Sequence, residues 1–352
     1  MKAKLRTVLG GLIPVTALVL VSTLDHVPGT AIELTVPYAA EGPGPTYDTL
    51  GEVGGKEVVD IHGAELDETT GQLNMTTVSV RTKMSLAMAL ERWIVHRDTI
   101  VPIEQIIPSN MTSEEVTQKN LQAFSSSEDA ATIAALNYLG MPLAMTVASV
   151  VDDSPAAGIL HAGDRLLRID ATPITSGDQV RQSVRAKMPG DQVTLDYVRD
   201  GVESSTTITL ASAPGQDENV PLLGVVMSVE SADGISIDYN LDDIGGPSAG
   251  MMFTLAVIDK LSPGELTGGQ FIAGTGTISS DGSVGPIGGI VHKMAAAKDA
   301  GAEVFLVPAD NCAEAVTRNF GDMKVVKVEN LADAVTQLEK ATAGDDYARC
   351  TD

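Results

Sequence analysis

The pattern of hydrophobic and polar positions changes three times along this chain of 352 residues. Residues 7–24 are almost wholly apolar and uncharged. Residues 32–137 mix short β-like runs with helical periodicity, residues 138–211 are dominated by β-like runs, and residues 221–340 alternate between the two. A mixture of this kind predicts an α+β protein of several domains.

The apolar run follows a basic end formed by Lys2, Lys4 and Arg6, and Asp25 closes it. It is near the lower length limit of about 18 residues for a helix that crosses a membrane. With residues 1–6 in the cytoplasm, the positive-inside rule predicts a single-pass transmembrane signal anchor at residues 7–24 in the cell membrane, and the rest of the chain lies outside the cytoplasm. A cleaved signal peptide is the alternative, because residues 29–31 form a weak small-x-small site.

The mixed region, residues 32–137, is predicted to begin with strands at 32–38, 57–61 and 73–81 and a Gly/Pro-rich loop at 41–46. Helical periodicity follows at 85–95, where Trp93 is expected to be a core residue. Two capping boxes predict the starts of two helices, Thr112 to Glu115 and Ser125 to Glu128, of which the second runs toward Tyr138.

Residues 138–211 carry a different pattern. Strands are predicted at 144–151 and up to Asp170, then a helix at 176–186, then two strands joined by the hairpin signal Asp200-Gly201. Residues 154–157 read Ser-Pro-Ala-Ala, and residues 162–167 read Ala-Gly-Asp-Arg-Leu-Leu. In that order these motifs resemble a PDZ domain of the bacterial protease type.

The resemblance to a PDZ domain implies that the domain binds an extended peptide as an additional strand and holds its terminal carboxylate in a loop of backbone N–H groups. The expected partners are therefore polypeptides with exposed C-termini. The sequence places that peptide-binding loop just before the first strand, at Tyr138, Leu139, Gly140 and Met141.

A polar linker at residues 212–220 leads into the last region. Its predicted strands are residues 222–230, 235–240, 271–278, 304–308 and 324–328. Its predicted helices are residues 248–260, 290–300, 310–318 and 330–340, before a flexible tail at 341–352.

Two segments of this region carry candidate chemistry. Residues 243–250 read Asp-Ile-Gly-Gly-Pro-Ser-Ala-Gly and place Ser248 at the start of a helix, and residues 286–293 read Pro-Ile-Gly-Gly-Ile-Val-His-Lys and place Lys293 one turn into another helix. A serine at a helix N-terminus is often only a cap. A hydroxyl in that positive local field also suits a nucleophile, and a lysine with a lowered pKa can act as its base.

Together these segments resemble the proteolytic domain of the Lon family, the Ser-Lys serine peptidases. The resemblance maps the nucleophile to Ser248, the base to Lys293 and a supporting residue to Thr275 in the strand between them. Backbone N–H groups of Gly245, Gly246 and Ser248 would stabilise the oxyanion. Many Lon proteases have an acidic residue where this chain has Gly245, and Asp242 and Asp243 lie close by.

The resemblances together imply a membrane-anchored, extracytoplasmic serine endopeptidase whose PDZ domain captures substrates. They also imply a homo-oligomer, because Lon relatives form rings. No G-x-x-x-x-G-K-[ST] motif occurs in the sequence, so cleavage is expected to be ATP-independent. The alternative is a catalytically silent scaffold that only binds exposed C-termini.

The composition of the chain limits the kinds of partner and cofactor that it can bind. A formal net charge of −24 argues against nucleic-acid binding, which needs a basic surface. No group of His, Cys and carboxylate residues has metal-ligand spacing, so neither a metal nor another cofactor is expected. The two cysteines, Cys312 and Cys350, either pair in an oxidising compartment or stay unpaired.

Overall fold

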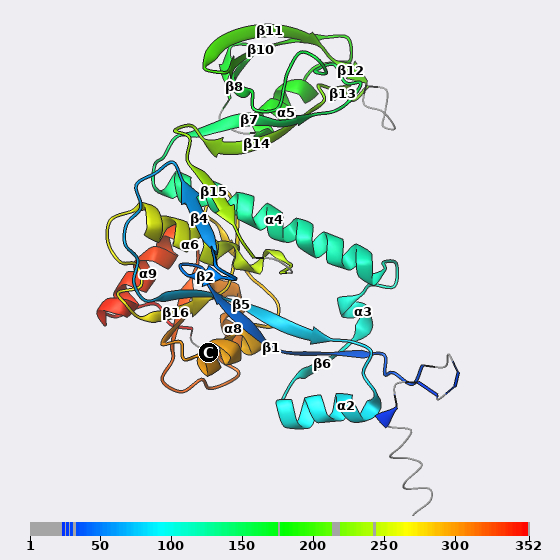
Figure 1. Ribbon diagram of the computed structural model, residues 1–352, viewed down its shortest axis with the longest axis vertical. Coiled ribbons are helices and arrows are strands. Elements are labelled where there is room, and N and C mark those ends of the chain that lie inside the picture. Colours follow the sequence, from blue (N-terminus) through cyan, green and yellow to red (C-terminus); the bar gives the residue numbers. More distant parts are fainter. Residues whose placement is uncertain are drawn as a thin grey trace, which may run out of the picture.

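The computed structural model describes residues 23–24, 26–27, 29–30, 33–174, 177–212, 219–241 and 244–350. The protein has a body built on a mixed sheet and a smaller β-rich domain at one end (Figure 1). This arrangement confirms the predicted α+β class. The expected membrane anchor falls almost entirely outside the described residues, and within them no helix has the length and apolar character needed to span a bilayer.

The body contains a six-stranded sheet with the order β20-β19-β16-β5-β1-β6. Four of its strands run parallel, and β1 and β6 add an antiparallel edge. The strands are β1 (Tyr38–Asp48), β5 (Gln72–Arg81), β6 (Thr99–Pro102), β16 (Phe271–Gly274), β19 (Val304–Pro308) and β20 (Lys324–Val328). Segments about 200 residues apart in sequence therefore form one sheet, since β5 pairs directly with β16.

Helices cover both faces of this sheet. One face packs against α4 (Ser113–Tyr138), α6 (Gly250–Leu261) and α9 (Leu331–Ala343), and Phe253 of α6 is fully buried against Phe124 of α4. The other face packs against α7 (Ile290–Ala300) and α8 (Cys312–Ala315). Alternation along β19 divides the two cores, because Val304 and Leu306 lie in the first and Phe305 in the second.

The smaller domain has a sheet of its own with the order β11-β10-β8-β7-β14, and β9 pairs with β8. Its elements are β7 (Leu143–Val150), β8 (Arg165–Ile169), β9 (Thr172–Pro173), α5 (Gly177–Arg185), β10 (Gln192–Arg199), β11 (Val202–Thr209) and β14 (Val225–Ser231). A separate hydrophobic core fills it. Helix α4 leads straight into β7, so the helix connects the body to this domain (Figure 1).

Short elements complete the described chain. They are β2 (Glu52–Val53), β3 (Lys56–Glu57), β4 (Val59–His62), α2 (Leu86–Glu91), the π-helix η1 (Arg92–His96), α3 (Ile103–Ile106), β12 (Ala211–Ser212), β13 (Pro221–Leu222), β15 (Ser236–Tyr239), the 3₁₀ turn η2 (Pro247–Ala249), β17 (Thr277–Ile278), β18 (Val284–Gly285) and the 3₁₀ turn η3 (Ala309–Asn311).

The pairing of strands crosses two of the domain boundaries expected from the sequence. Strand β14 lies within residues 221–340, yet it pairs with β7. Strands β1 and β5 lie within residues 32–137, yet they belong to the sheet of the C-terminal region. In the structure the smaller domain is therefore an insertion between two parts of the body, and the expected residue ranges remain predictions.

The Gly/Pro-rich segment at residues 41–46 was predicted as a loop, and this was wrong. It is part of β1, with an irregularity in its pairing to β5 between Pro43 and Thr46. A proline is tolerated at such a bulge because it has no ladder hydrogen bond to donate there. A Cβ on Gly44 would collide with Thr77 of β5, so glycine permits the close approach of the two strands.

Two further local predictions were wrong. The second capping box, Ser125 to Glu128, lies inside the single 26-residue helix α4, where buried Ser127 donates a hydrogen bond to Pro247 O. Trp93 is not a core residue either, because 60% of its surface is exposed. Local sequence signals did not reveal which face of each helix a distant segment covers.

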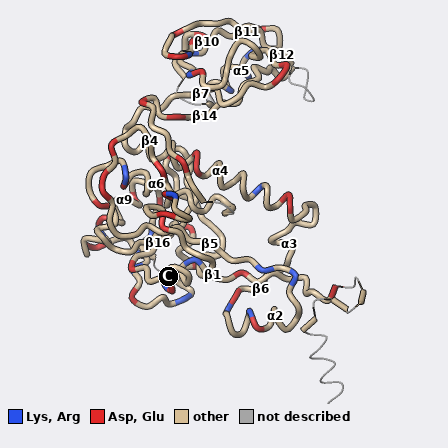
Figure 2. Tube along the Cα trace, in the orientation of Figure 1, with Lys and Arg blue, Asp and Glu red and all other residues tan. Residues whose placement is uncertain are grey.

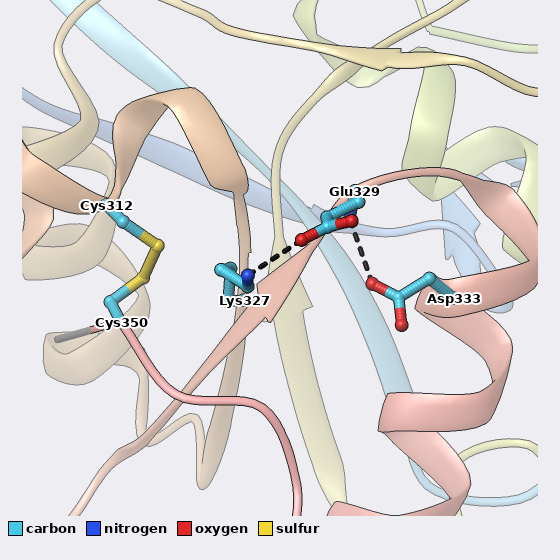
Figure 3. The surroundings of a disulfide bond; sticks show 5 residues. All are labelled: Cys312, Lys327, Glu329, Asp333 and Cys350. Atoms are coloured by element: carbon cyan, nitrogen blue, oxygen red, sulfur yellow. Dashed lines mark hydrogen bonds and ion pairs between the residues drawn. A yellow bond between two sulfur atoms is a disulfide. The ribbon is translucent and has the colours of Figure 1, made fainter.

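The C-terminal tail is attached to the body. Cys312 of α8 forms a disulfide with Cys350, as Figure 3 shows, which settles the alternative left open by the sequence. Ala348 O also accepts a hydrogen bond from Lys327 N of β20. Beside it, Lys327 forms an ion pair with Glu329 at 2.7 Å. The tail up to residue 350 therefore packs along the sheet edge.

Candidate active site

The turn η2 presents Ser248 at the start of α6. Gly246, which precedes the turn, has φ of +87°, a conformation that suits glycine. Pro247 then starts the turn, where its missing N–H costs nothing. Hydrogen bonds fix the turn from two sides, because Ser127 Oγ of α4 donates to Pro247 O at 3.0 Å and Gly276 N donates to Ser248 O at 3.0 Å.

Helix α7 brings Lys293 to this turn. The helix begins after Gly289, whose φ is +68° and whose Cβ position would lie 2.8 Å from a methyl of Val78. Lys293 Nζ donates to Ser248 Oγ at 2.7 Å. This is the distance that proton transfer between a nucleophile and its base requires.

Thr275 links the two groups. Its side chain is fully buried just after β16, and its Oγ1 accepts a hydrogen bond from Lys293 Nζ at 2.9 Å. The same hydroxyl donates to Ser248 O at 3.0 Å. The structure thus brings together all three residues that the sequence assigned to the nucleophile, the base and its support.

The electrostatic environment of Lys293 is unusual for a lysine. Only 3% of its surface is exposed, and burial lowers its pKa to about 7. Among the described residues no carboxylate lies within 4 Å of its ammonium group. Burial also lowers the pKa of the neighbouring His292, whose Nε2 lies 2.7 Å from Thr99 Oγ1. At neutral pH an unprotonated amine is therefore accessible at Lys293.

Ser248 and Lys293 line an open pocket of about 600 Å³. Among the lining residues that the structure describes, only Lys293 and Tyr47 are ionisable, and most of the wall is apolar. The apolar contributors are Pro45, Met75, Val78, Phe124, Ile244, Pro286 and Ile287. Such a pocket suits an uncharged, apolar side chain beside the serine.

The expected oxyanion donors are placed unequally. Gly245, Gly246 and Ser248 all line the pocket. However, Gly246 N already donates to Asn120 O of α4 at 2.8 Å, so this N–H is not directed at a ligand. Ser248 lies in the first turn of its helix, where backbone N–H groups lack intrahelical acceptors, and is the better placed donor.

The position of the acidic residue that many Lon proteases carry is blocked here. A Cβ on Gly245 would lie 2.8 Å from Asn120 Cβ, so α4 leaves no room for a larger side chain. Asp242 and Asp243 lie outside the described residues. Within the part of the chain that is described, no group of His, Cys, Asp and Glu residues is arranged to hold a metal ion.

Sequence reasoning missed Asn311, which holds the backbone of the pocket residue Ile287. Its buried side chain accepts a hydrogen bond from Ile287 N and donates one to Ile287 O, both at 2.9 Å. The amide therefore holds the segment that leads into α7 and Lys293. Nothing in the local sequence distinguishes Asn311 from an ordinary residue near the start of the helix predicted at 310–318.

The smaller domain has a second groove, of about 530 Å³, between α5 and β14. None of Tyr138, Leu139, Gly140 and Met141 lines it. They end α4 instead, and Met141 N donates to Leu136 O. The groove is lined by Val180 and Val184 of α5 and by residues 222–224, the Leu-Leu-Gly segment that precedes β14. In the described sheet β14 is an edge strand, and it pairs only with β7.

Comparisons with known proteins agree with this architecture. A family model described as the Lon protease (S16) C-terminal proteolytic domain matches residues 243–339, and a PDZ domain model matches residues 119–210. The archaeal Lon protease of Methanothermobacter thermautotrophicus is 37% identical over 105 residues, which are 29% of this chain and 16% of that protein.

A probable periplasmic serine endoprotease, DegP-like, of Pseudomonas fluorescens is 31% identical over 86 residues, which are 24% of this chain and 18% of that protein. The matched segments thus span less than a fifth of either relative's length. The PDZ domain of the SdrC-like protein of Listeria monocytogenes is 30% identical, covers 24% of this chain and 85% of that structure, and has a TM-score of 0.22. The family models thus match a Lon-type serine protease domain to residues 243–339 and a PDZ domain to residues 119–210 of this chain.

Proposed function

We propose that this chain is a serine endopeptidase that cleaves polypeptides through a dyad of Ser248 and Lys293. The observation that carries the proposal is the 2.7 Å contact between Lys293 Nζ and Ser248 Oγ, made by a lysine whose pKa burial lowers to about 7. A base with a pKa near the working pH is the most effective at accepting a proton.

The reaction follows from this geometry. The neutral amine of Lys293 removes the proton from Ser248 Oγ as the oxygen attacks a peptide carbonyl. The resulting oxyanion is stabilised by backbone N–H groups at the start of η2, with Ser248 N as the principal donor. The ammonium then gives its proton to the leaving amine, and water, activated in the same way, hydrolyses the acyl-enzyme. Thr275 orients the amine throughout.

Substrates are proposed to be polypeptides with exposed C-termini. The groove between α5 and β14 would receive the last residues of the substrate as a strand beside β14. The Leu222-Leu223-Gly224 segment, rather than the predicted loop at residues 138–141, would receive the terminal carboxylate, because it lines this groove at the start of β14. Capture there raises the local concentration of substrate without altering the chemistry.

An extracytoplasmic, membrane-tethered location is part of the proposal. The disulfide between Cys312 and Cys350 favours an oxidising compartment. The apolar residues 7–24 and the periplasmic relative give independent support. The absence of a phosphate loop from this sequence supports cleavage without ATP. Assembly into a ring, which the Lon resemblance implies, stays a prediction.

The test is digestion of a peptide library by the purified chain without nucleotide, with Ser248→Ala as the matched control. We expect cleavage next to apolar residues by the wild type and none by the variant. A serine-directed covalent probe should label wild type only. Intact peptides and an unlabelled Ser248 would instead favour the silent scaffold.

Amidating the substrate's C-terminus separates capture from chemistry. It should reduce cleavage of long substrates and leave short peptides unaffected, because only capture uses the carboxylate. Equal cleavage of free and amidated substrates would exclude carboxylate capture while leaving the dyad intact.

A further inference from the structure

The segment formed by α2 and η1, residues 86–96, exposes an apolar surface that the active site does not use. Its inner side is anchored to the body by buried Ala89 and by Met84 just before it. Its outer side carries large hydrophobic residues, and Trp93, Ile94 and Val95 are 60%, 66% and 68% exposed. Leu86, Met88 and Leu90 are exposed as well.

This surface is continuous with a groove. Leu86, Leu90 and Trp93 line an apolar hollow of about 570 Å³, whose opposite wall includes Tyr38 and Ile100 of the sheet edge. Contiguous exposed apolar patches on soluble proteins mark sites of interaction. Scattered single hydrophobic residues would not require an explanation, but six on one short helical segment do.

Charge around the patch differs from that of the whole chain. The protein has a formal net charge of −24, yet exposed Arg81, Lys83 and Arg97 flank this segment in the sequence, and Glu91 is the one exposed acidic residue within it. Figure 2 shows basic positions near the end of β5, which runs toward α2. Arg92 is already used, because it lies 3.4 Å from the buried carboxylate of Asp98. A basic rim around an apolar, tryptophan-containing face suits an anionic lipid surface.

The described chain enters the body beside this face. Val36 N donates to Met84 O at 2.8 Å, so the N-terminal segment joins the body directly beside α2. The apolar run ends 12 residues before Val36. A fully extended chain of that length reaches about 40 Å at most. In Figure 1, α2 lies at the end of the molecule opposite the PDZ domain.

We propose that the α2–η1 face docks onto the surface of an anionic lipid bilayer, with Trp93, Ile94 and Leu90 inserted at the headgroup level and the basic rim on the phosphates. This contact would fix the orientation of the body on the membrane and direct the PDZ domain away from it. The inference concerns a lipid contact additional to the expected anchor, and it stands whether or not Ser248 cleaves peptides.

The chain supplies its own probe, because Trp93 is its only tryptophan. The full chain would be reconstituted into vesicles of phosphatidylcholine and phosphatidylglycerol with and without brominated acyl chains. We expect brominated lipid to quench Trp93 emission, iodide in the buffer to have little effect, and a Leu90→Glu, Ile94→Glu variant to reverse both results while its peptide cleavage stays unchanged.

The matched control moves the single tryptophan from the α2–η1 face to the PDZ domain. In a Trp93→Phe, Val202→Trp chain the indole lies on the exposed β10–β11 hairpin of the PDZ domain, and it should be quenched by iodide and not by brominated lipid. Trp93 that is quenched only by iodide would show that the face is in water and overturn the proposal. Trp93 quenched by neither agent would also overturn it, because the face would then be covered by a second copy or by residues 7–24.

Discussion

Two lysines are buried in the body, and their surroundings differ. Lys260, at the end of α6, is 5% exposed, and Lys293, near the start of α7, is 3% exposed. Lys260 forms an ion pair with Glu57 at 2.6 Å and donates to Val59 O at 2.7 Å. Lys293 Nζ hydrogen-bonds to the hydroxyls of Ser248 and Thr275, and within the described part of the chain it forms no ion pair.

The position of each lysine in its helix also favours a charged Lys260 and disfavours a charged Lys293. Lys260 occupies the last turn of its helix, where the helix dipole stabilises a cation. Lys293 occupies the first turn, where the dipole disfavours one. Burial then lowers the pKa of Lys293 to about 7. The comparison indicates that Lys260 contributes to the fold as a cation, whereas Lys293 is held where it readily loses its proton.

The largest expected effect is on catalysis. Lys293→Met should reduce kcat/KM for a peptide by at least about 1,000-fold, because the amine is the proposed base. Ser248→Ala should have an equal effect, and the double variant should be no worse, since the two residues act as a unit. Steady-state kinetics on a fluorogenic peptide would measure all three.

Lys260→Met is the matched control for that experiment. It removes a buried lysine of the same body without contacting Ser248, so activity per folded molecule should stay near that of the wild type. Near-normal turnover by Lys293→Met at neutral pH would show that the base is wrongly assigned. A comparable loss in the Lys260 variant would show that removing any buried lysine disrupts the site.

The same pair should differ in the free energy of unfolding. The unfolded chain protonates Lys293 up to its ordinary pKa of about 10.4, whereas the folded chain releases that proton near pH 7. This difference in pKa lowers the free energy of unfolding of the wild type. The loss is largest below pH 7, and it disappears as the pH rises toward 10. Lys293→Met should therefore stabilise the fold by roughly 2–4 kcal/mol at pH 7 and by much less at pH 10.

Lys260→Met should instead destabilise the fold by about 1–3 kcal/mol, because it leaves Val59 O and Glu57 without their donor. Urea unfolding of both variants at pH 7 and pH 10 would measure the difference. If Lys293→Met is less stable than the wild type at pH 7, then burying the amine does not reduce the free energy of unfolding. The lowered pKa assigned to Lys293 would then be wrong.

The sequence predicted that Ser248, Thr275 and Lys293 lie together, because the signals that position them are local. Ser248 and Lys293 each start a helix after glycines that local conformation requires, and Thr275 follows a short buried strand. These signals are local. Asn120 and Asn311 act through backbone atoms of distant segments, so no local pattern identified them.

The fold predictions failed for segments whose structure depends on contacts with residues far away in the sequence. Residues 41–46 form a strand because β5 is available as a partner and glycine lets Thr77 approach. β14 joins the PDZ sheet although it follows the linker, because β7 is its hydrogen-bonding neighbour. Trp93 has the periodicity of a core residue, but its helix packs through Ala89. For β14 and α2 the local pattern predicted the type of element but not its partner, and for residues 41–46 it predicted neither.

The smallest expected effect sharpens the role of Thr275. Thr275→Val preserves side-chain volume but removes the hydroxyl that accepts from Lys293 Nζ and donates to Ser248 O. We expect kcat to fall by roughly 10- to 100-fold. In the wild type kcat/KM should rise as pH increases through about 7, because the neutral amine is the base. Without the hydroxyl the ammonium loses a hydrogen-bond acceptor, so the midpoint should move to lower pH.

A second group titrates in the same range and needs a control. Burial raises the pKa of Glu128 on α4 to about 7, and its neighbour Ser127 holds the nucleophile turn. Glu128→Gln should therefore leave the midpoint of the wild-type profile in place. A midpoint that vanishes in Glu128→Gln and is unmoved in Thr275→Val would assign the pH dependence to α4 rather than to the amine. A shift in Thr275→Val alone would place it at Lys293, whose amine donates to the hydroxyls of Ser248 and Thr275.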